Sequence, residues 1–389
     1  APNLIATTCF RAVVQNGHCA PANSTPTEVT VNPQISAGRV VPDTTICFNG
    51  NGGVLTLTGH TGDVVRWERS TDCAGFSGSQ TISNTSTTYT VGQLTQTTCY
   101  RAVVSNQGCP SLPSQPARVT VDPLSSVGLV SNAQTICAGS AAAPLTVGPY
   151  TGAIIRWESS TTCAPTFGAA TTIPVSSGTL NVGALNQTTC YRVVVKSGVC
   201  DEVLSAPVTI TVEAPPSGGT LSRDTTVCRG SNSGQLSLSG SVGTIQRWEW
   251  SEDCVNFSNP QTQVTSSSTF TSGALVNTTC YRVVVGGGTC PSAMSNVIRV
   301  TVDAPTTPGA LNGPVTVCAT SNGGTLQLQN AVGTVQRWES SATCPGFSGA
   351  VDLGQAGQLS YTYNNLAATT CYRVWVKNGV CPADRKSVV

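Results

Sequence analysis

The chain has 389 residues, of which 10% are charged, and its 19 basic and 18 acidic side chains leave a formal net charge of +1. This balance excludes nucleic acid as a partner, because phosphate binding needs a concentrated basic surface. Eighteen cysteines stand at regular spacings, and no two of them show the two-residue spacing typical of zinc sites, so they predict disulfides and an oxidising compartment, with no metal or other cofactor. No apolar stretch approaches the ~20 residues needed to cross a bilayer, and the first residues do not resemble a signal peptide. We expect no direct membrane insertion and a chain that is a window on a longer secreted protein.

One short pattern organises the chain: Thr-Thr-Cys, an aromatic residue and Arg, followed ten residues after the cysteine by a second cysteine. It occurs five times at intervals of about 90 residues, a length that fits a self-contained domain better than a solenoid repeat. No segment has a helical period, so we expect an all-β tandem array with about seven short strands per unit. The expected domains are an incomplete one at 1–33 (the N-terminal segment) and four others at 34–123, 124–214, 215–304 and 305–389 (repeats 1 to 4), the last with its final strand truncated.

The strands of repeat 1 follow in a regular order. An opening strand ends at Cys47, and a Gly-rich turn leads to residues 54–58, which alternate apolar and hydroxyl side chains. This alternation predicts a half-buried strand with Leu55 and Leu57 facing inward. Further strands are expected at 64–68, 87–91, 99–104 and 119–121.

A tryptophan recurs at one place in every repeat, 20 residues after one cysteine and six before another. On its strand we expect Val65 and Trp67 on the inner face and Arg66 and Glu68 on the outer face. Such a constant position favours a buried core residue over a sugar-stacking platform. The four tryptophans are Trp67, Trp157, Trp248 and Trp338.

Short linkers containing proline join the repeats, and they restrict the angle between neighbours, which predicts a semi-rigid rod. The motifs of repeat 1 follow in the order Thr45-Ile46-Cys47, Leu55-Thr56-Leu57, Arg66-Trp67-Glu68, Thr97-Thr98-Cys99-Tyr100-Arg101 and Cys109-Pro110. This order of motifs resembles the tandem Ig-like domains of large secreted surface proteins of the Bacteroidetes. The resemblance implies antiparallel β-sandwiches that form stalks, adhesins or cell-surface fibres.

The repeats depart from antibody domains in one respect, since the second strand carries leucines where an antibody domain has a core cysteine. In an Ig-type sheet the tryptophan strand runs antiparallel to the sixth strand, so the end of the first lies beside the start of the other. The resemblance therefore predicts one disulfide within each repeat. The predicted pairs are Cys73–Cys99, Cys163–Cys190, Cys254–Cys280 and Cys344–Cys371.

Two schemes are open for the remaining cysteines. The expected scheme ties the first strand of a repeat to the turn before its own last strand and leaves only Cys9 and Cys19 unpaired. The other places Cys47 at the far end of its domain, where it reaches Cys200 of the next repeat, and also leaves Cys109 and Cys318 unpaired. The expected pairs are Cys47–Cys109, Cys137–Cys200, Cys228–Cys290 and Cys318–Cys381.

Several residues suggest binding chemistry, and each has a simpler structural interpretation. The arginines of the tryptophan strands (Arg66, Arg156, Arg247 and Arg337) are interpreted as outer-face residues beside cross-strand pairs such as Glu68 with Arg101, and not as a ligand-binding ladder. Trp250 and Trp375 fall outside the repeated pattern, so only these two suggest a carbohydrate or protein partner. The acids before the linkers are too few for calcium, which needs six to eight oxygen ligands. These acids are Asp122, Glu213 and Asp303.

Nothing in the pattern predicts catalysis. The two histidines, His18 and His60, are expected in turns, and no Ser, His and acid recur together. Thr44 and Thr225 each follow an aspartate in a motif that resembles the short O-glycosylation signal of Bacteroidetes, which makes them candidate glycosylation sites.

The sequence therefore predicts a non-enzymatic, extracellular stalk or fibre segment of a cell-surface adhesin or filament, mechanically stabilised by two disulfides per domain. Its partners would be neighbouring domains or copies of the same protein. A self-polymerising variant is also open, in which the incomplete N-terminal segment or the truncated last sheet of one chain pairs with the next by strand addition. The alternative is a repeated lectin-like array that binds surface glycans weakly at many sites.

Overall fold

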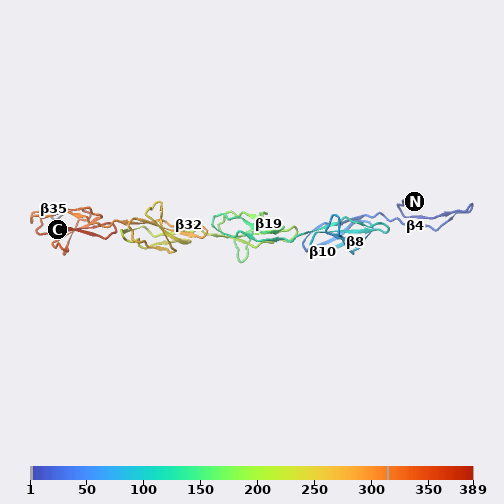
Figure 1. Ribbon diagram of the computed structural model, residues 1–389, viewed down its shortest axis with the longest axis horizontal. Coiled ribbons are helices and arrows are strands. Elements are labelled where there is room, and N and C mark those ends of the chain that lie inside the picture. Colours follow the sequence, from blue (N-terminus) through green and yellow to red (C-terminus); the bar gives the residue numbers. More distant parts are fainter. Residues whose placement is uncertain (1–2, 313–314, 389) are drawn as a thin grey trace. The chain divides into compact units, whose positions relative to one another are not determined.

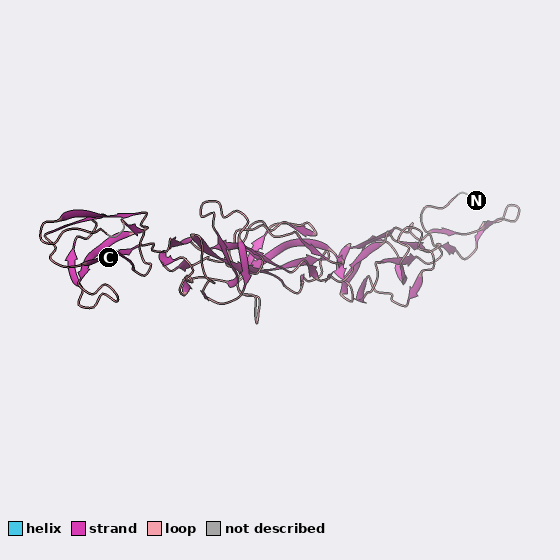
Figure 2. Ribbon diagram, turned by 60° about the vertical axis from the view of Figure 1, so that its left-hand side comes forward, coloured by secondary structure: helices cyan, strands magenta, loops and turns pink. Residues whose placement is uncertain are grey.

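The computed structural model describes residues 3–312 and 315–388. This part of the chain contains strands and no helix, which confirms the all-β class (Figure 2). Consequently, no helix within it is available to cross a bilayer. Residues 1–134 with 140–211 form one compact unit, and residues 135–139 with 212–389 form a second.

Repeat 1 lies in the first unit and is built from two sheets, whose strands β8 and β10 are labelled in Figure 1. Its strands are β5 Ala37–Val41, β6 Thr44–Cys47, β7 Asn51–His60, β8 Asp63–Ser70, β9 Gln80–Ile82, β10 Thr88–Gln93, β11 Thr98–Ser105, β12 Leu112–Pro113 and β13 Ala117–Asp122. The smaller sheet has the order β10-β7-β5, and the larger has the order β6-β13-β11-β8-β9, with β12 also paired to β11. All these pairs are antiparallel except β13 with β6, which is parallel. The first strand is divided, with β5 in the small sheet and β6 in the large sheet. Two facing sheets that share such a strand define an immunoglobulin-type sandwich.

The first unit also holds the N-terminal segment and most of repeat 2. In the N-terminal segment β1 pairs with β4 and β2 with β3, all of them short. The strands of the N-terminal segment and repeat 2 are β1 Thr8–Phe10, β2 Val13–Val14, β3 Ala22–Asn23, β4 Thr27–Val29, β14 Ser126–Val127, β15 Val130–Ser131, β16 Gln134–Cys137, β17 Leu145–Val147, β18 Tyr150–Thr151, β19 Ala153–Ser160, β20 Thr171–Ile173, β21 Thr179–Leu180, β22 Thr189–Lys196, β23 Val203–Leu204 and β24 Val208–Glu213. Of these, β16 beyond Gln134 and the last two residues of β24 belong to the second unit.

The second unit contains repeats 3 and 4. Their strands are β25 Thr220–Leu221, β26 Thr225–Cys228, β27 Leu236–Ser239, β28 Thr244–Ser251, β29 Gln261–Val264, β30 Thr269–Phe270, β31 Thr279–Gly287, β32 Cys290–Met294, β33 Ile298–Asp303, β34 Ala310–Leu311, β35 Gly323–Gln329, β36 Thr334–Ser341, β37 Val351–Gly354, β38 Ser360–Asn364, β39 Cys371–Lys377 and β40 Asp384–Val388. Repeat 3 repeats the order of repeat 1, with a small sheet β25-β27-β30 and a large sheet β26-β33-β31-β28-β29. Repeat 4 has a small sheet β34-β35-β38 and a four-stranded sheet β37-β36-β39-β40.

The core of repeat 1 surrounds Trp67, which is fully buried between the two sheets. Leu55 and Leu57 face it from the small sheet, as the alternation of their strand predicted. The indole N–H of Trp67 donates to the backbone oxygen of Ser86 at 2.9 Å, so its one polar atom is satisfied. The tryptophans of the other three repeats are equally buried and make the same type of bond.

The expectation that Val65 shares the inner face with Trp67 is wrong. Val64 is 6% exposed and Val65 is 42% exposed. The register shifts at this point, because Val103 pairs with Arg66 but Val104 pairs with Val64. Val65 is therefore the extra residue of a β-bulge, which reverses the alternation of the strand.

Repeat 4 differs from repeats 1 and 3 at its last strand. In repeat 1 a serine, Ser114, accepts the backbone N–H of Ala102 at 3.0 Å and separates β12 from β13. Lys386 occupies this position in repeat 4, and β40 continues antiparallel to β39 without interruption. Residues 315–318, which correspond to β6, form no strand in the described part of repeat 4.

Candidate functional site at the junctions between repeats

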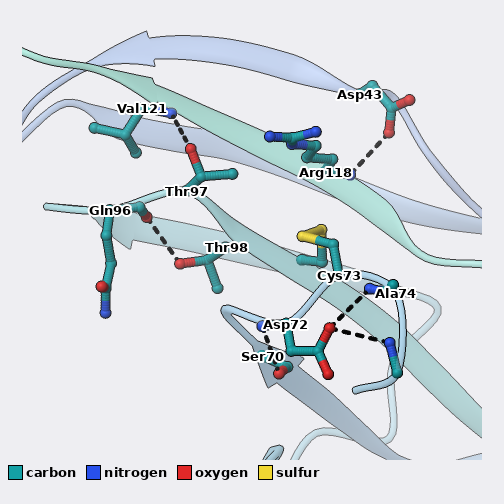
Figure 3. Close-up of a disulfide and its surroundings, with 12 residues drawn as sticks. Asp43, Ser70, Asp72, Cys73, Ala74, Gln96, Thr97, Thr98, Arg118 and Val121 are labelled. Carbon is teal, nitrogen blue, oxygen red and sulfur yellow. Dashed lines mark hydrogen bonds between the residues drawn. A yellow bond between two sulfur atoms is a disulfide. The ribbon is translucent and has the colours of Figure 1, made fainter. Parts of the chain in front are cut away.

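One disulfide within each repeat ties the end of the tryptophan strand to the start of the sixth strand. Figure 3 shows Cys73 in its surroundings, on the loop that follows β8. The cysteine Cα atoms of the four bonds lie 5.3 to 5.6 Å apart. The bonds are Cys73–Cys99, Cys163–Cys190, Cys254–Cys280 and Cys344–Cys371.

An aspartate shapes the loop that carries Cys73. Asp72 Oδ1 accepts the backbone N–H groups of Ala74 at 3.2 Å and Gly75 at 3.1 Å (Figure 3). Its other oxygen accepts the Ser77 hydroxyl at 2.6 Å. The Ser77 hydroxyl, followed by the backbone N–H groups of Gly75 and Ser77, lowers the pKa of Asp72 to about 2.

The second set of disulfides joins different repeats, so the expected pairs Cys47–Cys109, Cys137–Cys200, Cys228–Cys290 and Cys318–Cys381 are wrong. Each observed bond spans 153 residues, with Cα atoms 4.8 or 4.9 Å apart. The observed bonds are Cys47–Cys200, Cys137–Cys290 and Cys228–Cys381. The unpaired cysteines of the described chain are Cys9, Cys19, Cys109 and Cys318.

The strand directions explain this pairing. Because β6 runs parallel to β13, Cys47 lies beside Asp122, where the chain leaves repeat 1. β11 runs antiparallel to β13, so its end and the following turn with Cys109 lie at the opposite end of the repeat. Cys47 is therefore far from Cys109 and close to the turn of the next repeat that carries Cys200. The parallel pairing of the first strand with the last is the feature that the sequence motifs do not predict.

Asp122, the acid at the end of repeat 1, also holds the turn of repeat 2 that carries Cys200, and we call this contact the junction clamp. Asp122 Oδ2 accepts the backbone N–H of Val199 at 3.0 Å, and the Asp122 carbonyl accepts the N–H of Phe48 at 2.9 Å. Gly198 has a positive φ of 47°, and a Cβ there would collide with the Asp122 carboxylate. Ser125 adds a second clamp, since its hydroxyl accepts the N–H of Ser197 at 2.9 Å.

The same clamp recurs twice in the second unit. Glu213 accepts the backbone N–H of Thr289 at 2.8 Å, next to Cys290. Asp303 accepts the N–H of Val380 at 3.0 Å, next to Cys381. These acids therefore bind backbone amides of the following turn. The described residues contain no group of three or more His, Cys, Asp or Glu side chains arranged to hold a metal ion.

The junction before repeat 1 has an amide in place of the acid. The Asn32 side-chain amide donates to the carbonyl of Gln107, and that of Asn106 donates to the carbonyl of Pro33 at 3.2 Å. Cys109, in the turn that these bonds hold, is half-buried and has no sulfur partner. The polar part of the clamp is thus formed there without the disulfide.

The repeated arginines form a structural cluster on the outer face. Glu68 is 6% exposed and lies between Arg66 and Arg101, each with a guanidinium nitrogen 2.8 Å from a carboxylate oxygen. Burial raises the pKa of Glu68, but the hydrogen bonds of Arg101 and Arg66 outweigh burial and leave the pKa below its ordinary value. Arg101 also stacks on Phe76 at 4.1 Å. The sequence motifs did not predict a role for this phenylalanine, although it recurs three or four residues after the cysteine of each such loop. The four are Phe76, Phe167, Phe257 and Phe347.

The two unusual tryptophans have different surroundings. Trp375 is half-buried beneath the guanidinium groups of Arg337 at 4.8 Å and Arg385 at 5.1 Å. Trp250 stacks on Phe270 at 5.5 Å and borders a polar hollow of about 450 Å³. Trp375 is therefore covered, whereas Trp250 contributes to a recess.

The histidines and the candidate glycosylation sites lie apart from the junction clamps. His18 is exposed in a turn, whereas His60 is the last residue of β7 and not part of a turn. Thr44 and Thr225 are half-buried in strands, and glycosylation there stays a prediction. Asp43, which precedes Thr44, accepts the backbone N–H of Arg118 at 2.8 Å (Figure 3).

The fold and the junctions define a tandem array of immunoglobulin-type sandwiches in which disulfides tie each repeat to the next. Residues 1–33, 36–123, 126–214, 217–304 and 307–389 match a family described as a domain of unknown function, DUF8696, and the chain belongs to that family. No curated protein matches the chain.

Several solved structures are similar to the chain at low sequence identity. Three immunoglobulin domains of titin share 10% identity at a TM-score of 0.42, covering 67% of this chain and 95% of the titin chain. Sidekick-1 immunoglobulin domains 1–4 share 12% identity at a TM-score of 0.29, covering 89% and 95%. The extracellular domains 3–5 of Drosophila OTK share 11% at a TM-score of 0.30, covering 70% and 98%.

Proposed function

We propose that this chain is a non-enzymatic, extracellular spacer, a segment of a stalk or fibre in a cell-surface adhesin or filament. The observation that carries the proposal is the staggered disulfide set, in which each bond starts in one repeat and ends in the next. Disulfides persist outside the reducing cytosol, which supports a secreted protein. The resemblance to Bacteroidetes surface proteins supports a place on the cell surface.

The staggered bonds give a mechanical reason for this role. A force applied to the two ends passes through the shortest covalent route, and the bonds let that route bypass most of every repeat. A sandwich that lies off the route can unfold without releasing its full chain length. A disulfide confined to one repeat would protect only its own loop. We therefore propose that the array limits extension under load at the level of the whole chain, with neighbouring repeats as its main partners.

Pulling single molecules of the full chain by its ends, with and without a reductant, tests the proposal. The oxidised chain should stop at a short extension, and the reduced chain should lengthen several-fold. Equal maximum extensions in the two conditions would remove the mechanical role. Electron microscopy of the same material distinguishes single arrays from filaments.

A lectin-like array is the second candidate, and the recess beside Trp250 is the observation that favours it. Glu252 and Asn277 border the recess with their polar side chains hydrogen-bonded to each other at 3.1 Å. An aromatic edge with carboxylate and amide groups suits a sugar hydroxyl pattern. A glycan array probed with the full chain and with Trp250→Ala tests this candidate, because a pure spacer binds no glycan in either form.

A further inference from the structure

We infer that repeat 1 carries a binding site for an acidic sugar, a hexuronic acid residue of a polysaccharide, in a hollow beside Arg69. The guanidinium of Arg69 holds the sugar carboxylate, and the glutamine amides around it bind the hydroxyl groups. This site lies in a different repeat from the recess beside Trp250. It adds a binding activity that the spacer proposal does not require.

The hollow lies where the tryptophan strand of repeat 1 ends. It has a volume of about 320 Å³, and its lining comes from the end of β8, the start of β9 and the segment that joins β10 to β11. Figure 3 shows Ser70, Gln96 and Thr98 of this lining. Ser70, Leu94 and Thr98 are buried and form the floor, whereas Arg69 stands on the exposed rim. The volume falls at the lower end of the range for small-molecule sites.

Arg69 lies on the inner face of its strand. It follows the buried Trp67 by two positions, and it pairs across the sheet with Gln80 and with Tyr100. Burial, followed by the neighbouring Tyr89, raises the pKa of the Tyr100 phenol, and Arg69 acts against both, which places the guanidinium beside this hydroxyl. The other repeats have uncharged residues at the position of Arg69. These are Ser159, Trp250 and Ser340.

The charge of Arg69 has no counter-ion in the described chain. Arg66 and Arg101, on the outer face, share the carboxylate of Glu68, but none of the ion pairs between described residues includes Arg69. Among the described residues that line the hollow, none is acidic. The carboxylate of nearby Asp72 is occupied by the amides and the hydroxyl of its own loop. The hollow therefore has a positive lining that attracts an anion.

The guanidinium is held in position. Arg69 Nε donates to Gln80 Oε1 at 2.9 Å. The disulfide between Cys73 and Cys99 anchors the strand end next to Arg69, because Cys99 pairs with Ser70. An arginine carries more N–H donors than the contact with Gln80 occupies, so the others are available to a ligand. Two such donors match the two oxygens of a carboxylate, and this bidentate arrangement gives short, strong hydrogen bonds.

Amide groups surround the arginine. The side-chain oxygen of Gln80 accepts from Arg69, so its amino group is left to donate. The side chains of Gln93 and Gln96 line the hollow and have no hydrogen-bond partner in the described chain. A side-chain amide both donates and accepts, as a sugar hydroxyl does. The lining can therefore bind several hydroxyl groups next to the carboxylate.

The lining favours a sugar over a peptide carboxylate. Leu94 is the only large apolar residue among the described residues of the lining, and at 9% exposed it offers little apolar surface. A peptide would bring apolar side chains that this hollow cannot cover. The backbone of Leu94 is also fixed, since its N–H donates to the carbonyl of Gly50 at 3.1 Å and its carbonyl accepts the N–H of Asn49 at 2.8 Å. A fixed polar lining binds without the cost of ordering a loop.

The same place in repeat 3 is also hollow, but its chemistry differs. The recess beside Trp250 is lined by residues at equivalent positions, with Glu252 at the position of Thr71. Glu252 and Asp253 give that recess two carboxylates. A hollow therefore occurs at this place in two repeats, and the residues after the core tryptophan set its charge. The hollow of repeat 1 suits an anion, whereas the recess of repeat 3 repels one.

Saturation-transfer NMR on the full chain tests the inference, with sodium glucuronate as the probe. Glucose is the matched ligand, because it differs only at C6, where it has a hydroxymethyl group in place of the carboxylate. Glucuronate should bind at least about tenfold more tightly than glucose, and Arg69→Gln should remove this advantage. The control Arg118→Gln removes an exposed arginine of the same repeat that lies outside the hollow, and it should leave glucuronate binding unchanged.

Two further measurements separate a sugar site from a general anion site. Gln93→Ala with Gln96→Ala should weaken glucuronate binding several-fold, because hydroxyl contacts are lost while Arg69 remains. Sodium sulfate should compete with glucuronate only weakly. Melting curves that match wild type show that the variants are folded.

Three results overturn the inference: no binding of glucuronate, equal binding in Arg69→Gln and wild type, or competition by sulfate that equals competition by glucuronate itself. Unchanged binding in the double glutamine variant also overturns the assignment to a sugar. None of these results changes the extension of a single chain, and Trp250→Ala tests the other recess separately. A failure of this site is therefore distinguishable from a failure of the spacer or the lectin proposal.

Discussion

Removal of the disulfides between repeats should change how far the chain extends much more than removal of those within repeats. The perturbation replaces all six cysteines of the three inter-repeat bonds by serine and leaves the four bonds within repeats intact. The six are Cys47, Cys200, Cys137, Cys290, Cys228 and Cys381.

The covalent route through the wild-type chain sets the expected extension. It follows residues 1–47, crosses to 200–228 and then to 381–389. This route contains about 85 residues, and at 3.3–3.6 Å per residue it reaches about 290 Å. The six-serine variant keeps only the four bonds within repeats, and each of these shortens the covalent route by its own loop. About 280 residues therefore remain on the route, which reaches about 970 Å. If Cys47 were bonded to Cys109, and the equivalent cysteines of the other repeats were bonded in the same way, the covalent route would reach about 480 Å on the same scale.

Force spectroscopy of the end-tethered chain measures these lengths. The control variant Cys73→Ser, Cys99→Ser should extend no further than wild type, because that loop lies inside the bypassed residues 47–200. The same control should lose roughly 3.5 kcal/mol of unfolding free energy in repeat 1 on the loop-entropy estimate. A wild-type extension near 480 Å, or a control that lengthens by its loop, would refute the staggered route.

Three further predictions concern single carboxylates. Glu68→Gln should cost about 1–3 kcal/mol of unfolding free energy in denaturant titration, because it leaves Arg101 and the half-exposed Arg66 with a neutral partner. The control Glu202→Gln, which removes an exposed ion pair, should cost under about 1 kcal/mol. Asp122→Ala should speed hydrogen exchange at the Val199 amide at least tenfold, and an unchanged rate would show that the carboxylate does not hold the turn. Because the pKa of Asp72 is about 2 in the folded chain and about 3.9 in an unfolded one, its ionised form stabilises the fold above about pH 4 and this contribution is lost as pH falls toward 2. Melting temperatures from pH 5 to 2 should fall less steeply in Asp72→Asn than in wild type, and parallel curves would contradict the assignment.

Local patterns in the sequence determined much of the fold. The alternation at Leu55 and Leu57 identified the inner face of that strand, and the constant position of Trp67 identified the centre of the core. Cys73 and Cys99 could be paired through the resemblance to an Ig-type sheet, in which the ends of these two neighbouring antiparallel strands adjoin. Each of these inferences depends on residues close in the chain or on one antiparallel register.

Tertiary structure alone decided the remaining features. The bulge at Val65 depends on how β8 meets β11, and no alternation within one strand reveals it. The choice of Cys200 over Cys109 as the partner of Cys47 depends on the parallel pairing of β6 with β13, whose paired residues lie about 75 positions apart. A parallel pair has no tight turn to set its register. The direction of the first strand, and with it the repeat to which its cysteine is bonded, is therefore decided only when the two sheets pack.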